Sequence, residues 1–265
     1  MRILILGCGN IGLCLAKMLA QQGHQVTAVS RHSKNIAPIQ HLSQDIRELK
    51  LASNMQFDWV YVILTPEQRS VSAYQAAFID TARPVFQALE THPIQRLVFI
   101  SSTRVYGENT GQWIDDTTAV ASHDPIGQTL ITAEQLWSAY WQDKLTIIRP
   151  SGLYRAYSPY WQRRAHECEE IAFLHWTNRL HRQDLVGFLS YLTTLSHLEP
   201  SYIVSDNMPL AESEIINFIR EQNGLSIIKN ISIQSVTGKR IAARRLVQSG
   251  YCLQYPDFFS AHKKA

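Results

Sequence analysis

The sequence predicts an α/β protein built on a doubly wound, parallel β-sheet. A strand, a glycine turn, a helix and a second strand follow one another within residues 1–31. Continuous apolar runs then recur, separated by segments with helical spacing, at Phe57–Leu64, Gln95–Ile100 and Leu145–Arg149. Apolar runs without alternation are typical of parallel strands buried on both faces of a sheet. With 265 residues, 45% of them hydrophobic, the chain is long enough to bury a full core.

The first thirty-one residues form one βαβ unit. An apolar strand, Arg2–Leu6, ends at the turn Gly7-Cys8-Gly9-Asn10-Ile11-Gly12, and apolar residues then recur at helical spacing. A second strand, Val26–Val29, follows the break at Gly23-His24. Two strands joined through a helix in this way pair in parallel.

Each glycine of the turn has its own role in a dinucleotide-binding site of the Rossmann type. Gly7 permits the tight turn, Gly9 lets backbone amides approach a pyrophosphate, and Gly12 lets the helix pack closely on the sheet. The amides at the start of the helix, those of Asn10 and Ile11 included, suit a diphosphate because they are unpaired and carry partial positive charge. The alternative is a glycine-rich turn that binds no ligand, but the strand before the turn and the helix after it favour the cofactor site.

The end of the second strand indicates which dinucleotide is bound. An acidic residue there would accept hydrogen bonds from the ribose 2′-hydroxyl of NAD, whereas this chain has Ser30, Arg31 and His32. Arg31 suits a 2′-phosphate, with Ser30 and His32 as additional donors. We therefore expect NADP as the preferred cofactor, with NAD as the alternative; in the second case Arg31 is a solvated loop cation.

The next segments are expected to complete the adenosine side of the site. Asp45 is a candidate acceptor for the adenine amino group, and Ile46 is a candidate for packing on the adenine ring. The alternative for Asp45 is an ordinary loop carboxylate. The buried strand that ends at Leu64 places that residue over the cofactor crevice. A helix is predicted over residues 71–89, and Pro84 within it predicts a kink or an early end.

Polar residues follow the next strand at Ser101–Gly107 and form a plausible site at the same edge of the sheet. Five segments carry a resemblance to a known family: GCGNIG at residues 7–12, LVFISSTRVYG at 97–107, IIRPSGLY at 147–154, TNRLHRQDL at 177–185 and GKRIAARRLVQSGYCLQYP at 238–256. Together they resemble the extended short-chain dehydrogenase/reductases of the NAD-dependent epimerase/dehydratase superfamily, and the last segment resembles the tail of the atypical branch. The resemblance covers essentially the whole chain.

The resemblance implies a dinucleotide-binding domain, residues 1–155 and 177–204, and a small C-terminal substrate-side domain, residues 156–176 and 205–265. It places Ser102 where the family serine holds the substrate hydroxyl, and Pro150 beside the nicotinamide. It also implies a Tyr-x-x-x-Lys pair at the start of the next helix, but Ile126 and Leu130 stand at those positions. Neither side chain can transfer a proton or lower the pKa of a tyrosine, so the usual acid/base chemistry is in doubt.

Two other tyrosines are candidate proton donors. Tyr106 and Tyr154 each follow a strand, and the alternative for both is a packing and hydrogen-bonding role. The sequence does contain a Tyr-x-x-x-Lys motif at Tyr140 and Lys144. At 1.5 Å per residue, Tyr140 lies about 20 Å along the helix from Ile126, so we expect this motif to be structural.

Composition bounds the remaining possibilities. The net charge is only +3 and there is no long basic block, so we expect no nucleic-acid partner. The four cysteines have neither disulfide-framework nor zinc spacing, and no metal site is expected. No uncharged window is long enough to cross a membrane, so we expect a soluble, cytoplasmic protein with no membrane partner. The expected partner is a small-molecule substrate. A homodimer is expected if the protein follows its relatives.

Two functions remain open at this point. The first is an NAD(P)-dependent oxidoreductase, epimerase or dehydratase acting on a sugar nucleotide or another hydroxyl or carbonyl compound. The second is a catalytically inactive NADP-binding sensor or regulatory module. The glycine turn supports both equally, Ile126 and Leu130 favour the second, and the Ser102–Gly107 stretch favours the first.

Overall fold

The computed structural model describes residues 1–155, 158–171, 173–229 and 233–262. The chain divides into two compact units. The first comprises residues 1–107, 120–149 and 185–202, and the second comprises residues 108–119, 150–184 and 203–265.

These units differ from the expected division mainly at residues 108–119, 150–155 and 177–184, which fall in the second unit. The reason is strand pairing. β6 (Trp113–Asp115) pairs with β14 (Arg240–Ala242), and β8 (Gly152–Tyr154) pairs with β10 (Arg179–His181). Each pairing ties an earlier segment to the later part of the chain.

A seven-stranded sheet has the order β11-β7-β5-β4-β1-β2-β3. Its strands are β1 (Arg2–Leu6), β2 (Gln25–Ser30), β3 (Gln40–Ser43), β4 (Trp59–Val62), β5 (Arg96–Ile100), β7 (Leu145–Pro150) and β11 (Ser201–Val204). The pairs from β3 across to β7 are all parallel. All residues of β4 and β7 are buried, which confirms the expectation from their unbroken apolar runs.

The strand order places the ligand-binding edge of the sheet. The chain runs from β1 outward to β2 and β3, and then returns to the other side of β1 as β4. In open parallel sheets, the crevice at such a reversal, beyond the carboxyl ends of the strands, is where ligands bind. The carboxyl ends of β1, β2 and β4 therefore define the expected site.

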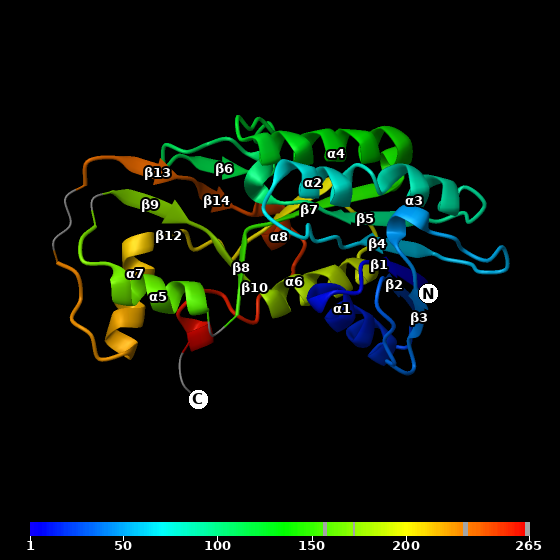
Figure 1. Ribbon diagram of the computed structural model, residues 1–265, viewed down its shortest axis with the longest axis horizontal. Coiled ribbons are helices and arrows are strands. Elements are labelled where there is room, and N and C mark those ends of the chain that lie inside the picture. The colour runs from blue at the N-terminus through cyan, green and yellow to red at the C-terminus, as the bar shows by residue number, and fades with distance from the viewer. Residues whose placement is uncertain (156–157, 172, 230–232, 263–265) are drawn as a thin grey trace. The chain divides into compact units, whose positions relative to one another are not determined.

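Helices cover both faces of this sheet (Figure 1). One face carries α2 (Val71–Phe78), α3 (Ala82–Leu89) and α4 (Pro125–Trp141), and the other carries α1 (Asn10–Gln21) and α6 (Arg182–Tyr191). The indole of Trp137 donates to the carbonyl of Phe78, 3.0 Å away, and so joins α4 to α2. On the opposite face, Ser190 donates to the side chain of Gln22 at 2.8 Å.

Two details of the first unit differ from expectation. The predicted helix over residues 71–89 is two helices, because the chain turns at residues 79–81, where the Thr81 hydroxyl donates to the carbonyl of Ala77. Pro84 lies in the first turn of α3, where its missing amide costs no helix hydrogen bond. The edge strand β3 was also not predicted, because this half-exposed segment, QHLS, lacks an apolar run.

The second unit contains short strands and a separate core. In addition to the two pairs named above, β9 (Leu174–Thr177) lies between β12 (Leu210–Ala211) and β13 (Val236–Gly238). Helices α5 (Pro159–Glu167) and α7 (Glu212–Gln222) bury Trp161, Ile215 and Ile219 in one apolar cluster.

The helix α8, near the C-terminus, is short and spans only Arg244–Gln248. Arg240, which precedes it in the same basic stretch, is the first residue of β14. Gly238 adopts a positive φ of 78°, a conformation that turns the chain into β14, where Arg240 pairs with Trp113.

Candidate functional site

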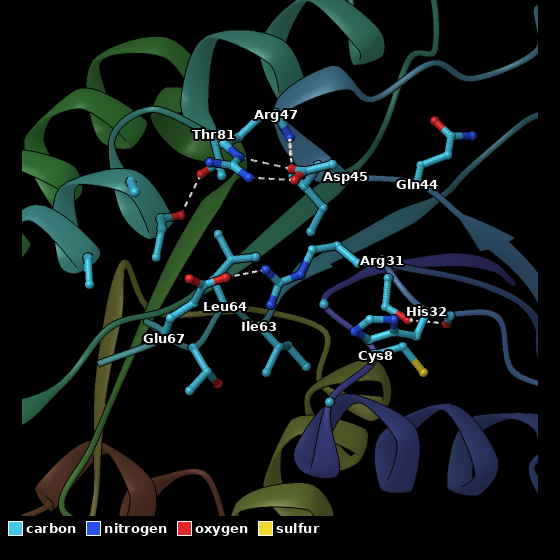
Figure 2. Close-up of a pocket in the computed structure, with 18 of the residues that line it drawn as sticks. Cys8, Arg31, His32, Gln44, Asp45, Arg47, Ile63, Leu64, Glu67 and Thr81 are labelled. Atoms are coloured by element: carbon cyan, nitrogen blue, oxygen red, sulfur yellow. Dashed lines mark hydrogen bonds and ion pairs between the residues drawn. The ribbon is translucent and has the colours of Figure 1, made fainter. Parts of the chain in front are cut away.

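A cavity of about 360 Å³ lies at the carboxyl ends of β1, β2, β3 and β4 (Figure 2). Its volume falls in the range of small-molecule sites, roughly 300–1,000 Å³. Residues predicted as cofactor ligands line it from four different strand ends: Gly7, Gly9, Ser30, Arg31, Asp45, Ile46 and Leu64. The alanines of α2 form part of the wall, and Asn10, Ile11 and Gly12 begin α1 beside it.

Two glycines of the turn are required by backbone geometry. Gly7 has a φ of 103°, and a Cβ placed there would clash with the carbonyl oxygen of Ile63 in the neighbouring strand end. A Cβ on Gly12 would clash in the same way with the carbonyl oxygen of Gly7. These contacts hold the turn, the helix and the sheet together as the sequence predicts.

Gly9 differs from both, because it faces open space. It is the N-cap of α1 and has an ordinary φ of −77°, and no heavy atom of the described residues lies within 4 Å of a Cβ placed on it. A glycine here has no side chain that could cap the helix, so the first amides of α1 stay available to a ligand. This cradle fits the diphosphate of a dinucleotide, which binds amides at a helix N-terminus.

Arg31 crosses the cavity toward β4. Its guanidinium forms an ion pair with Glu67, and both side chains are more than half exposed (Figure 2). Ser30 lies beside it and shares a hydrogen bond of 2.8 Å with the ring of His41. The cation expected at the end of β2, Arg31, therefore lies in the cavity. Its acidic partner, Glu67, was not predicted from the sequence.

Asp45 and Arg47 form a second ion pair in the same cavity. The Asp45 carboxylate accepts from Arg47 Nη2 at 2.6 Å, from Nε at 3.1 Å and from the backbone amide of Arg47 at 2.9 Å. The hydrogen bond from the Arg47 side chain is the main cause that lowers the pKa of Asp45 to about 2. Ile46 is buried beside this pair, and Leu64 is partly exposed across the cavity.

Ser102 and Tyr106 follow β5, as expected, but their environments differ. Ser102 is partly buried, and its hydroxyl accepts from the amide of Arg104 at 3.2 Å. Tyr106 is 2% exposed, and its hydroxyl accepts from Arg149 Nη1 at 2.8 Å. The guanidinium of Arg149 in turn makes two hydrogen bonds to Glu134, at 3.0 and 2.7 Å.

The positions of the missing Tyr-x-x-x-Lys pair are apolar and buried. Ile126 and Leu130 point into the core from the first turns of α4. Asp124 caps this helix and forms an ion pair with Arg104, which follows Ser102 in the chain by two residues. Tyr140 lies near the other end of α4, where it stacks on Phe86 with ring centroids 4.1 Å apart.

In the second unit, the remaining candidates make structural contacts. The Tyr154 hydroxyl donates to the carbonyl of Asp257 at 3.2 Å, and burial raises its pKa above the usual range. Pro150 is the buried last residue of β7. Asp184 accepts from the amides of Gln254 and Tyr255, so it fixes the C-terminal segment.

Within the described ranges, no group of three His, Cys, Asp or Glu side chains is arranged to hold a metal ion. In the same part of the chain, every helix is too short or too polar to cross a membrane.

Comparison with solved structures gives many similar folds. A protein of Methylobacillus flagellatus assigned to the NAD-dependent epimerase/dehydratases is 31% identical, with a TM-score of 0.82 over 98% of this chain and 96% of that one. MoeE5, solved in complex with UDP-glucuronic acid and NAD, has a TM-score of 0.78 over 96% and 94% of the two chains. At 19% identity, MoeE5 supports the fold alone.

Two sequence comparisons agree with this fold. The uncharacterized UDP-glucose epimerase YtcB of Bacillus subtilis strain 168 is 35% identical over 69 residues, which are 26% of this chain and 22% of that protein. The family model described as NAD dependent epimerase/dehydratase family matches residues 3–198. This range holds the glycine turn, Arg31, the residues that follow β5 and most of the parallel sheet. The chain therefore belongs to the NAD dependent epimerase/dehydratase family.

Proposed function

We propose that this protein binds NADP in the cavity at the glycine turn and acts as an oxidoreductase, epimerase or dehydratase on a hydroxyl or carbonyl compound. The observation that carries the proposal is the joint lining of one cavity by Gly7, Gly9 and Arg31. A sugar nucleotide is the substrate class we favour, because the related fold of MoeE5 is solved with UDP-glucuronic acid.

The diphosphate, the 2′-phosphate and the adenine each have a counterpart among residues that line the cavity or lie beside it. The amides of Asn10 and Ile11 would hold the diphosphate, and Arg31 with Ser30 would hold the 2′-phosphate. Ile46 and Leu64 offer apolar surfaces to the adenine ring, and Asp45 offers an acceptor to its amino group. When bound, the nicotinamide supplies the hydride donor or acceptor.

The chain's own chemistry centres on the end of β5. Ser102 would hold the substrate hydroxyl through its side chain, and Tyr106 is the proposed proton donor in place of the absent pair on α4. The buried Arg149 donates to the Tyr106 hydroxyl at 2.8 Å and so fixes the position of this hydroxyl. Pro150 is proposed to border the nicotinamide. We also propose a homodimer that forms through exposed apolar residues of α4 such as Leu136 and Tyr140.

Replacing Arg31 with alanine is expected to weaken NADPH binding by about 10–100-fold, since a hydrogen-bonded charge pair contributes about 1.5–3 kcal/mol. NADH lacks the 2′-phosphate, so its affinity should change much less. Calorimetric titration measures both affinities. Arg69→Ala is the matched control because Arg69 is exposed and is not among the cavity-lining residues. Equal losses for both nucleotides would contradict the assignment of Arg31 to the 2′-phosphate.

Replacing Tyr106 with phenylalanine is expected to slow turnover by about 10²–10⁴-fold if its hydroxyl transfers the proton. NADPH affinity should stay the same because Tyr106 does not line the cofactor cavity. Hydride transfer is followed by the absorbance of the reduced nicotinamide. The control is Tyr140→Phe, because Tyr140 lies at the end of α4 that is far from Ile126. An unchanged rate in Tyr106→Phe would remove Tyr106 from the mechanism.

A further inference from the structure

Five charged side chains line the cavity: Lys34 and four others that form two ion pairs, Arg31 with Glu67 and Arg47 with Asp45 (Figure 2). The two pairs are held very differently. Asp45 accepts three hydrogen bonds from Arg47 and caps the short helix that follows it. Among the described residues, the hydrogen bond from Arg31 is the only one recorded for Glu67, whose side chain is 72% exposed. Three hydrogen bonds therefore hold Arg47 on Asp45, whereas separating Glu67 from Arg31 costs little free energy.

The Arg31–Glu67 pair also spans the crevice. Arg31 follows β2 and Glu67 follows β4, and these strands lie on opposite sides of β1, where the glycine turn begins. Both residues line the cavity together with Gly9, Ile46 and Leu64. A dinucleotide seated on the glycine turn would thus meet the Glu67 carboxylate beside the cation proposed for its 2′-phosphate.

We propose that Glu67 is a built-in counterion that occupies, on Arg31, the place of the 2′-phosphate and thereby sets the preference between NADP and NAD. The inference rests on the proposed function, because it requires a dinucleotide in this cavity. Carboxylate and phosphate oxygens bind a guanidinium in the same way, so one anion must displace the other. NADP binding then requires Glu67 to move away and to tolerate a second anion nearby, whereas NAD makes neither demand.

Charge removal at Glu67 isolates this effect. The hydrogen bond from Arg31 lowers the pKa of Glu67, so this carboxyl is ionised at neutral pH. In Glu67→Gln the competing charge is lost while the size of the side chain is kept. Electrostatic energies at such a partly exposed site predict that NADPH affinity rises by about 3–10-fold at low ionic strength. The gain should shrink in about 0.5 M salt, because the Debye length is then only a few ångströms.

The experiment is a set of calorimetric titrations with NADPH, NADH and two fragments, 2′,5′-ADP and 5′-AMP, which differ only in the 2′-phosphate. In Glu67→Gln we expect tighter binding of NADPH and 2′,5′-ADP, with NADH and 5′-AMP within about twofold of the wild type. The matched control is Glu48→Gln, which removes an exposed carboxylate from the helix that follows Asp45 and does not line the cavity that holds Arg31 and Glu67.

The possible failures can be distinguished. If the wild type binds a dinucleotide but Glu67→Gln leaves the ratio of NADPH to NADH affinity unchanged or lowers it, this inference is overturned and the proposed function stands. Such a fall would mean that Glu67 orients Arg31 for the phosphate instead of competing with it. If neither dinucleotide binds to the wild type, the proposed function is overturned and the inference with it.

Discussion

Replacing Glu134 with leucine is expected to lower the free energy of unfolding by about 3–5 kcal/mol, because the buried Arg149 then lacks its counterion. The Arg149–Glu134 pair is nearly inaccessible, with side-chain exposures of 10% and 5%, and it is joined by two hydrogen bonds. Among the described residues the guanidinium would then keep only its hydrogen bond to Tyr106, which cannot offset the desolvation of the cation. Urea-induced unfolding followed by circular dichroism measures the change.

Two further variants keep this prediction testable even if Glu134→Leu does not fold. The double variant Glu134→Leu with Arg149→Met removes both charges and should be more stable than either single variant, since apolar replacement of a buried pair is often neutral. Glu67→Gln breaks an exposed pair and should leave the midpoint of urea-induced unfolding nearly unchanged. A similarly small change in Glu134→Leu would show that the Arg149–Glu134 pair does not stabilise the core.

Two neighbouring glycine variants should separate folding from cofactor binding. Gly9→Ala is expected to keep the stability of the wild type, because a Cβ there meets no described atom within 4 Å and the backbone is in an ordinary extended conformation. The added methyl group occupies the space where a diphosphate approaches the amides of α1. If that overlap costs about 1–3 kcal/mol, NADPH affinity falls by about 10–100-fold.

Gly7→Ala should instead unfold or severely destabilise the protein. The Cβ would clash with the carbonyl oxygen of Ile63, and a φ of 103° is strained for any residue with a side chain. Thermal unfolding should therefore distinguish the two variants, because only Gly7→Ala loses stability, whereas Gly9→Ala loses NADPH affinity while it remains folded. Full NADPH affinity in a folded Gly9→Ala would place the diphosphate elsewhere.

Much of this fold is predictable from the sequence because local patterns determine it. The βαβ unit at residues 1–31 combines unbroken apolar strands with a glycine turn, and no other arrangement satisfies the turn and both strands. The break between α2 and α3 was misplaced because the turn at residues 79–81 depends on the Thr81 side chain and not on Pro84. β3 was not predicted because the sequence of a polar edge strand lacks the apolar pattern that would distinguish it from a loop.

The candidate site is predictable to a similar extent. Strand ends in a parallel sheet converge, so Gly7, Arg31, Asp45 and Leu64 could be expected to meet in one crevice, as they do. Their partners could not be predicted. Glu67 lies 36 residues after Arg31, and Arg149 lies 43 residues after Tyr106, so both contacts depend on tertiary packing. The one available signal was Glu134, an acidic residue on a helix with a buried apolar face.

The most direct test of the central claim is calorimetric titration of the wild-type protein with NADPH and NADH at the same ionic strength. The claim is that the glycine turn and Arg31 form a working dinucleotide site. It predicts one binding site per chain, with NADPH bound more tightly than NADH. Binding of neither dinucleotide would contradict the claim, because the fold would then be present without the cofactor site on which the proposed activity depends.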